Sequence, residues 1–267
     1  MKITFLGTSH GIAEKHQFLS SAVVTVGGKH YIIDAGAPLT SLLKNHDIDF
    51  KDVNGIFITH PHFDHFIGLT ELTFQINGFN QFDGVKIPTY VPDLLPFKRM
   101  MYYLTGTKDL NPYFGYDEKY NNGNYGATPY PTRITFNKYS EGVIFKDDLI
   151  TITAVKNMHI EDSYSFLLET KDKAVVFSGD LKHGIPDYPK CIIDRTTNLD
   201  AVILEGAHTK LCLPEVLEVL KKSKTNLMLI NHYYAGVNND DELLLTKNLL
   251  KNYFPLKVVK DNDVFEI

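Results

Sequence analysis

The stretch Thr59-His60-Pro61-His62-Phe63-Asp64-His65 decides how this chain of 267 residues is expected to fold. It follows the apolar run Gly55 to Ile58, which predicts a short buried strand. Three imidazoles and a carboxylate therefore leave the end of one strand within six positions. Neutral histidine and ionised aspartate are ordinary ligands for zinc-like cations, and a cation would hold such crowded groups in their deprotonated forms. The stretch predicts a metal site, because a solvated polar turn would not explain this density and spacing of ligand types.

The spacing within this stretch favours two metal ions. His60 and His62 are two positions apart, so their side chains point the same way on an extended backbone. Asp64 and His65 lie beyond the turn, where they could bind a second ion beside the first.

Composition narrows the classes of protein. With 43% hydrophobic residues the chain can bury a large core, and its length suits one α/β domain over residues 1–267. A net charge of −5 argues against a generally basic nucleic-acid binder, although not against a local basic patch. No apolar run reaches membrane-spanning length, and the start reads as a strand rather than a signal peptide. Two cysteines in no metal-type spacing predict a protein of the reducing cytoplasm.

Other apolar runs along the chain also end in histidine, aspartate or glutamate. These strand-end groups are Asp34, His159, Asp180, Glu205, His208 and His232. Strand-end side chains from distant positions can converge at one edge of a sheet, where loops hold a metal site. Asp34 has two interpretations: it could fix the tautomer of a ligand imidazole, or it could be a turn-forming or helix-capping residue.

The order of the expected elements predicts the fold class. Strands and helices both occur throughout, and several neighbouring β-runs have no helix between them, which argues against a parallel doubly wound sheet. We expect an α/β (α+β) protein with two mixed sheets packed face to face and helices outside. Helices are expected at residues 38–46, 66–79, 92–104, 213–222 and 240–253.

Residues 85–139 differ in composition from the rest of the chain. They carry nine of the 15 tyrosines, interleaved with proline, asparagine and glycine. A long segment without regular periodicity is typical of a functional lid, while its aromatic content argues against disorder. We expect a tyrosine-rich lid or insertion here that covers a substrate or contacts a partner subunit. The alternative is a plain structural excursion that buries its tyrosines against its own domain.

The series His60-x-His62-x-Asp64-His65, then His159, Asp180 and His232, resembles the metallo-β-lactamase fold superfamily. This resemblance covers nearly the whole chain, from Ile3 to His232. It implies a four-layer αββα sandwich with two divalent metals at the sheet edge. One ion would be held by His60, His62 and His159, and the other by Asp64, His65 and His232, with Asp180 bridging. Histidine and aspartate ligands suit Zn²⁺, with Mn²⁺ or Fe²⁺ as alternatives, and the resemblance also implies a homodimer.

Two further motifs indicate a branch of the superfamily. Phe5-Leu6-Gly7-Thr8 and Glu205-x-x-His208 resemble the tRNA 3′-processing endonucleases and the cyclic phosphodiesterases of phosphonate breakdown. In those families a histidine at the place of His208 assists the leaving group. Glu205 would orient His208, or it is an ordinary strand-end carboxylate. His232 is followed by Tyr233-Tyr234, whereas the pattern in the endonucleases at this place is His-Ser-Thr. No Gly/Pro-rich basic arm for gripping tRNA is evident either. The sequence therefore favours a small phosphodiester such as a cyclic nucleotide over tRNA.

The expected reaction is hydrolysis. Two cations would lower the pKa of a shared water and stabilise the charge that builds on the phosphoryl oxygens. Asp64 would bind metal and orient the resulting hydroxide, and His208 would donate a proton to the departing oxygen. The rival functions are a tRNA-processing endonuclease, a lactone or thioester hydrolase, and a non-catalytic binding module. His10 and His16 lie in the loop after the first expected strand, which could bring them near the site, but without a partner motif they and His183 are interpreted as loop residues.

Overall fold

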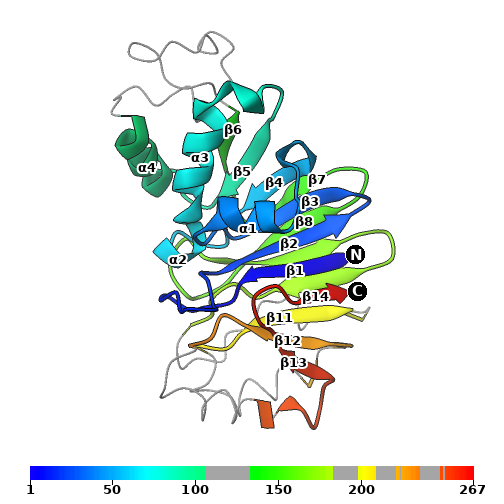
Figure 1. The fold of residues 1–267 in the computed structure, drawn as a ribbon. Coiled ribbons are helices and arrows are strands. Elements are labelled where there is room, and N and C mark those ends of the chain that lie inside the picture. The colour runs from blue at the N-terminus through cyan, green and yellow to red at the C-terminus, as the bar shows by residue number, and fades with distance from the viewer. Residues whose placement is uncertain (106–132, 183–197, 209–220, 223, 235–246, 249) are drawn as a thin grey trace.

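The computed structural model describes residues 1–105, 133–182, 198–208, 221–222, 224–234, 247–248 and 250–267 (Figure 1). One sheet is formed mainly by the N-terminal half of the chain. Its strands in spatial order are β14 (Val264–Glu266), β1 (Lys2–Gly7), β2 (Ser21–Val26), β3 (Lys29–Ile33), β4 (Val53–Phe57), β5 (Ile87–Val91) and β6 (Ile134–Lys138). Pairing is antiparallel from β14 to β3 and parallel from β3 to β6, so the sheet is mixed.

The second sheet comes from the C-terminal half and repeats this pattern. Its order is β13 (Leu256–Val258), β12 (Met228–Asn231), β11 (Ala201–Glu205), β10 (Ala174–Phe177), β9 (Tyr164–Glu169), β8 (Thr151–Lys156) and β7 (Gly142–Lys146). The first four strands are parallel and the last four antiparallel, with β10 belonging to both groups. The prediction of two mixed sheets is therefore confirmed.

Alternation of side chains along the strands builds the layers. In β3, Ile32 packs toward the helices while Tyr31 and Ile33 pack toward the other sheet, as a period of two requires. The core between the sheets includes Phe5, Phe57, Phe166, Val175, Ile203 and Leu229. The helices over the first sheet are α1 (Leu39–Asn45), α2 (Phe63–Phe66), α3 (Gly68–Gly78) and α4 (Leu95–Thr105), with 3₁₀ turns at Phe50–Asp52 and Asn80–Phe82.

The helices expected at 38–46, 66–79 and 92–104 are confirmed as α1, α3 and α4. Those expected at 213–222 and 240–253 lie largely outside the described residues. On the outer face of the second sheet, Leu250 and Phe254 pack with Val202 and Ile230. None of the described helices is long and apolar enough to cross a lipid bilayer.

The prediction of a lid or insertion over residues 85–139 is corrected at both ends of that range. It opens with β5 and α4 and closes with β6, so its ends are part of the first sheet and its helix layer. Only residues 106–132 remain for a lid, and they lie outside the described residues. The two strands could not be predicted from the sequence because both are short. Their side chains become buried only when β5 and β6 pair with each other and β5 pairs with β4.

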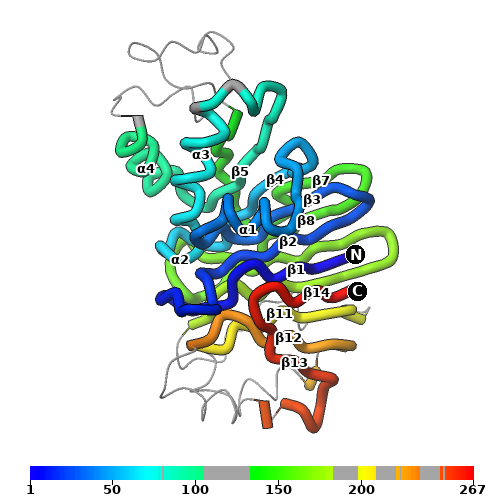
Figure 2. The backbone as a smooth tube through the Cα atoms, in the orientation of Figure 1, coloured from blue at the N-terminus to red at the C-terminus, as the bar shows by residue number. Residues whose placement is uncertain are grey.

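The two ends of the chain lie side by side on the first sheet, where β14 pairs with β1 (Figure 2). The backbone amide of Ile267 donates to the carbonyl of Met1 at 2.8 Å. The C-terminal strand therefore forms one edge of the sheet that the N-terminal half mainly builds.

Candidate metal centre

The predicted metal ligands follow the ends of buried strands. The loop Ile58–His62 follows β4 and leads into α2, which begins at Phe63. Asp180 follows β10, His232 follows β12, and His159 lies in the loop after β8. Asp34, directly after β3, and His232 both adopt positive φ, 57° and 52°. Backbone strain of this kind concentrates at functional sites, where the surrounding structure holds it in place.

One group of donor atoms is formed by His60, His62 and His159. His62 Nδ1 lies 3.0 Å from His60 Nε2 and 3.1 Å from His159 Nε2. Asp180 Oδ2 lies 3.8 Å from His60 Nε2 and 3.7 Å from His159 Nε2. These four residues form one cluster that could hold a cation.

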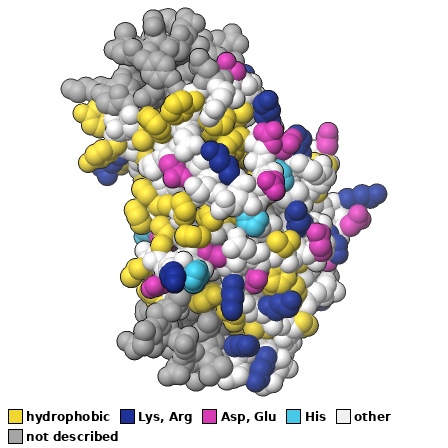
Figure 3. Space-filling model, in the orientation of Figure 1, with side chains coloured by type: hydrophobic (Ala, Val, Ile, Leu, Met, Phe, Trp, Pro, Cys, Tyr) yellow, Lys and Arg dark blue, Asp and Glu magenta, His cyan; other side chains and the backbone are white. Residues whose placement is uncertain are grey.

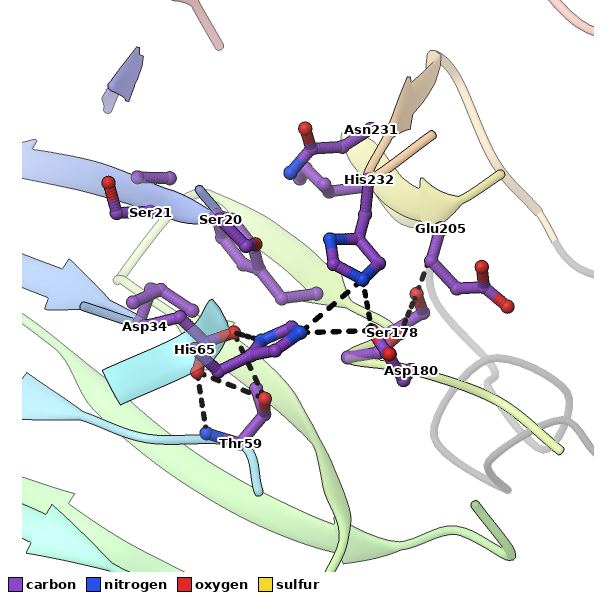
Figure 4. Close-up of a pocket in the computed structure, with 15 residues that line it drawn as sticks. Ser20, Ser21, Asp34, Thr59, His65, Ser178, Asp180, Glu205, Asn231 and His232 are labelled. Carbon is purple, nitrogen blue, oxygen red and sulfur yellow. Dashed lines mark hydrogen bonds and ion pairs between the residues drawn. The ribbon is translucent and has the colours of Figure 1, made fainter. Parts of the chain in front are cut away.

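A second group faces the other oxygen of Asp180. The Nε2 atoms of His65 and His232 are 3.4 Å apart, and Asp180 Oδ1 lies 3.3 Å and 3.1 Å from them (Figure 4). Asp64 Oδ2 is 3.7 Å from each of these two nitrogens. All seven predicted ligands are therefore brought together, and Asp180 presents one carboxylate oxygen to each group.

The spacing of the donor atoms fits divalent cations. Ligands of a tetrahedral zinc ion at about 2.0–2.2 Å must lie about 3.3–3.6 Å from one another. The distances in the two groups, 3.0 to 3.8 Å, lie on both sides of this range. Imidazole and carboxylate at this spacing are a donor set for a divalent metal.

Asp34 supports the centre from behind, which settles its two interpretations in favour of a partner for a ligand. Its Oδ2 lies 2.8 Å from His65 Nδ1, so that nitrogen donates and Nε2 is left facing the centre. The backbone amide of Thr59 donates to Asp34 Oδ1 at 2.8 Å, and the Thr59 hydroxyl lies 3.0 Å from both carboxylate oxygens. That hydroxyl is also 3.1 Å from His60 Nδ1, so Asp34 orients imidazoles of both groups.

The electrostatics keep the carboxylates ionised. Burial alone would raise the pKa of Asp180, but the imidazoles of His232 and His65 hold that pKa well below its ordinary value. Burial alone would lower the pKa of His65, and the carboxylates of Asp180 and Asp34 raise it well above its ordinary value. Burial lowers the pKa of His60 well below its ordinary value. The charge balance thus supplies anionic oxygens and, at His60, a neutral ring, as metal binding requires.

The centre has a closed side and an open side. Between the sheets lies a pocket of about 30 Å³ lined by Ser20, Ser21, Asp34, Thr59, Ser178, Asn231 and others (Figure 4). That volume has room for only a few water molecules. On the other side His62 is exposed, and His159 and His208 are partly exposed. Apolar side chains gather on the surface over α2 (Figure 3), where Phe63, next to His62, is 58% exposed.

His208 lies on the open side with Glu205 behind it. Glu205 Oε2 accepts hydrogen bonds from the backbone amides of Ala207 at 2.7 Å and His208 at 2.8 Å. The same oxygen lies 3.5 Å from His208 Nδ1. Burial would lower the pKa of His208, but the contact with Glu205 raises it above its ordinary value. Glu205 is thus placed to orient His208, as one of its two interpretations expected.

The sequence of this chain is similar to those of known proteins. Residues 1–107 match the family model described as anti-Pycsar protein Apyc1. The chain is 25% identical over 222 residues to ribonuclease Z of Synechococcus sp. (strain CC9311), which covers 80% of this chain and 65% of that protein. The chain therefore spans less than two thirds of that relative's length.

Solved structures decide the fold. The metallo-β-lactamase fold protein YhfI from Bacillus subtilis superposes with a TM-score of 0.73 at 18% identity, covering 100% of this chain and 99% of that one. The chain has the metallo-β-lactamase fold. A diphosphatase from the PhnP family also superposes, with a TM-score of 0.64 at 14% identity, covering 100% of this chain and 97% of that one. The expected sandwich of two mixed sheets is confirmed.

One histidine of this metallo-β-lactamase fold reaches the centre, although the sequence reasoning interpreted it as a loop residue that could lie near the site. His10, in the loop after β1, has its ring centroid 4.8 Å from that of His208 and 4.7 Å from that of His232. Burial, and next the charge of His232, lower the pKa of His10 to about 3. Its position just after a strand was the one available signal. His16 is exposed in the same loop, and His183 lies outside the described residues.

Proposed function

We propose that the protein is a dinuclear metal-dependent phosphodiesterase that acts on a small phosphodiester such as a cyclic nucleotide. One observation carries this proposal: the two oxygens of Asp180 face two separate donor groups, and His208 stands beside them on the open side. Two adjacent cations with a proton donor at their edge suit the displacement of an oxygen from phosphorus.

The residues divide the chemistry between them. Two cations in these groups, Zn²⁺ by the nature of the ligands, would supply a nucleophilic hydroxide near neutral pH and would neutralise phosphoryl oxygens. Asp64 Oδ2 accepts a hydrogen bond from the amide of Gly11 at 2.8 Å, which fixes the carboxylate beside His65 and His232. His208 would protonate the leaving oxygen, and Glu205 would hold it for that transfer.

Several features support a small substrate. Phe63 and Met158 are exposed apolar residues next to His62 and His159 in the chain, where they could contact the base of a nucleotide. A net charge of −5 offers little general attraction for a polyanionic RNA. The diphosphatase from the PhnP family shares the fold.

A second candidate is a tRNA 3′-processing-type endoribonuclease, which the similarity to ribonuclease Z favours. Purified protein supplied with zinc, manganese or iron(II) should therefore be assayed on bis(4-nitrophenyl) phosphate, 3′,5′-cyclic nucleotides, precursor tRNA and a panel of lactones. We expect turnover of the phosphodiesters. Cleavage of tRNA alone would favour the second candidate, and turnover of lactones alone would contradict both.

The role of His208 has its own test. The variant His208→Ala should keep its metal content. Its turnover of cyclic nucleotides should fall by about 10²- to 10⁴-fold, the usual contribution of a general acid. Since the protonated ring is the active form, wild-type turnover should fall as pH rises through the raised pKa of His208, and this limb should vanish in the variant. His16→Ala, a change of an exposed histidine, is the control. Unchanged turnover in His208→Ala would remove it from the reaction.

Zinc as the native ion, a homodimeric assembly and a cytoplasmic location stay predictions from the sequence. Metal analysis of protein purified without added metal would test the first, and the mass of the protein in solution the second. Fractionation of the source cells would test the third.

A further inference from the structure

His10 lies against two aromatic rings at the open side of the centre. Its ring stacks on His232 with centroids 4.7 Å apart at 20°, and on Tyr234 with centroids 4.3 Å apart at 23°. Its backbone amide donates to the carbonyl of Tyr233 at 3.3 Å, which ties the loop after β1 to the loop after β12. Stacking between aromatic rings fixes the plane of the imidazole and leaves its edge as the part that can form hydrogen bonds.

That edge meets His208. The two Nε2 atoms lie 3.4 Å apart, although the residues are 198 positions apart in the sequence. His208 Nδ1 lies 3.5 Å from Glu205 Oε2 and 3.7 Å from Asp180 Oδ2, while its Nε2 faces His10. An imidazole proton between two such nitrogens is donated by one and accepted by the other.

We propose that His10 is a positioning residue for the leaving-group proton: its Nε2 accepts the hydrogen bond of His208 Nε2–H and holds it where the departing oxygen binds. This inference rests on the proposed phosphodiesterase. The leaving oxygen then replaces His10 as the acceptor. A hydroxide derived from water forms a new bond to phosphorus as the bond from phosphorus to the leaving oxygen breaks. The electron pair of the broken bond stays on the leaving oxygen, which takes the proton from His208 Nε2. His208 is left neutral and regains a proton from solvent.

Tyr234 completes this arrangement. It follows His232 by two positions, in the loop after β12. Its ring supplies one of the two surfaces on which His10 rests. A loop histidine without a role would gain little from being ordered between two rings, because ordering a side chain costs conformational entropy.

The test uses the leaving group as the readout. Turnover by the metal-loaded full chain should be measured on a series of diaryl phosphates, from bis(4-nitrophenyl) phosphate to diphenyl phosphate, whose leaving phenols become weaker acids. A 4-nitrophenolate leaves readily without a proton, whereas a phenolate depends more on an acid. We expect His10→Ala to lower turnover of diphenyl phosphate by about tenfold, a part of what a general acid contributes, and to leave bis(4-nitrophenyl) phosphate within about twofold of wild type.

Three further measurements separate this role from a structural one. His10→Gln, whose amide oxygen can accept the hydrogen bond, should recover turnover of diphenyl phosphate. The double variant His10→Ala/His208→Ala should be no slower than His208→Ala, since residues that act through one step are not additive. Metal content and thermal unfolding of His10→Ala should match those of His16→Ala, an exposed histidine from the same loop.

Each contrary result would overturn the inference. Equal losses across the diaryl series would show that His10 has no part in protonation. Loss of metal in His10→Ala would make it a ligand instead, and additive losses in the double variant would separate it from His208. Wild-type protein inactive on every diaryl phosphate and on cyclic nucleotides would remove both proposals, whereas an active wild type with parallel leaving-group slopes removes the role of His10 alone.

Discussion

The inner and outer sides of the metal centre are built differently. On the inner side, His60, His65, Asp180 and His232 are at most 3% exposed and follow buried strands of both sheets. On the outer side, His62 is exposed, and His10, His159 and His208 are partly exposed and lie in loops. Asp34 orients the inner imidazoles, whereas the outer residues are open to solvent on one side. We infer that the inner residues fix the position of the ions, and that His62 and His159 complete one donor group on the side that meets the substrate.

The largest effect should follow from removing the shared inner carboxylate. Asp180 presents one carboxylate oxygen to each donor group, so Asp180→Ala should lower metal occupancy in both, whereas His62→Ala removes a ligand from one group only. Turnover of Asp180→Ala should fall by more than the about 100-fold that loss of a ligand's outer partner can cause. Metal per chain after dialysis against a fixed zinc concentration measures the difference.

Two outcomes would contradict this account of the inner and outer sides. Equal metal loss in Asp180→Ala and His62→Ala would contradict a division between an inner and an outer side. Full occupancy in Asp180→Ala would show that the two donor groups bind ions independently.

A smaller effect should come from the residue behind the inner ligands. Asp34→Asn keeps the shape of the side chain and tolerates the positive φ, but it weakens the charge-assisted contact with His65 Nδ1. Metal affinity should fall by about 10- to 100-fold. Competition with a chromogenic chelator measures it. Asp47→Asn is a matched control, because Asp47 is exposed and also has positive φ, 54°; a similar loss there would rule out a specific role for Asp34.

The position of a residue relative to a strand end explains what the sequence could predict. The ligands on both sides of the centre were accessible because they come soon after apolar strands, and a local pattern of buried strand then polar group is visible in the chain. The contacts of His10 could not be predicted in this way, because its neighbours Tyr234 and His208 lie in loops of the other sheet. Only folding brings these residues to His10. β5 and β6 were hidden in the tyrosine-rich segment for a similar reason, since their strand character depends on pairing. Local periodicity reveals which strand ends carry ligands, and it cannot show contacts between distant loops.

The smallest effect should come from a polar contact far from the centre. Tyr31 is fully buried between the sheets, and its hydroxyl donates to Asp147 Oδ2 at 2.7 Å. Tyr31→Phe should lower the free energy of unfolding by about 1–3 kcal/mol, as expected for a hydrogen bond to a charged group, and leave metal affinity and turnover unchanged. Urea unfolding of metal-free protein measures it, with Tyr103→Phe, at an exposed tyrosine, as the control. Because this contact joins β3 to the turn before β8 without touching the centre, a change in metal affinity would mean that the inner side depends on the packing between the sheets as well as on its own hydrogen bonds.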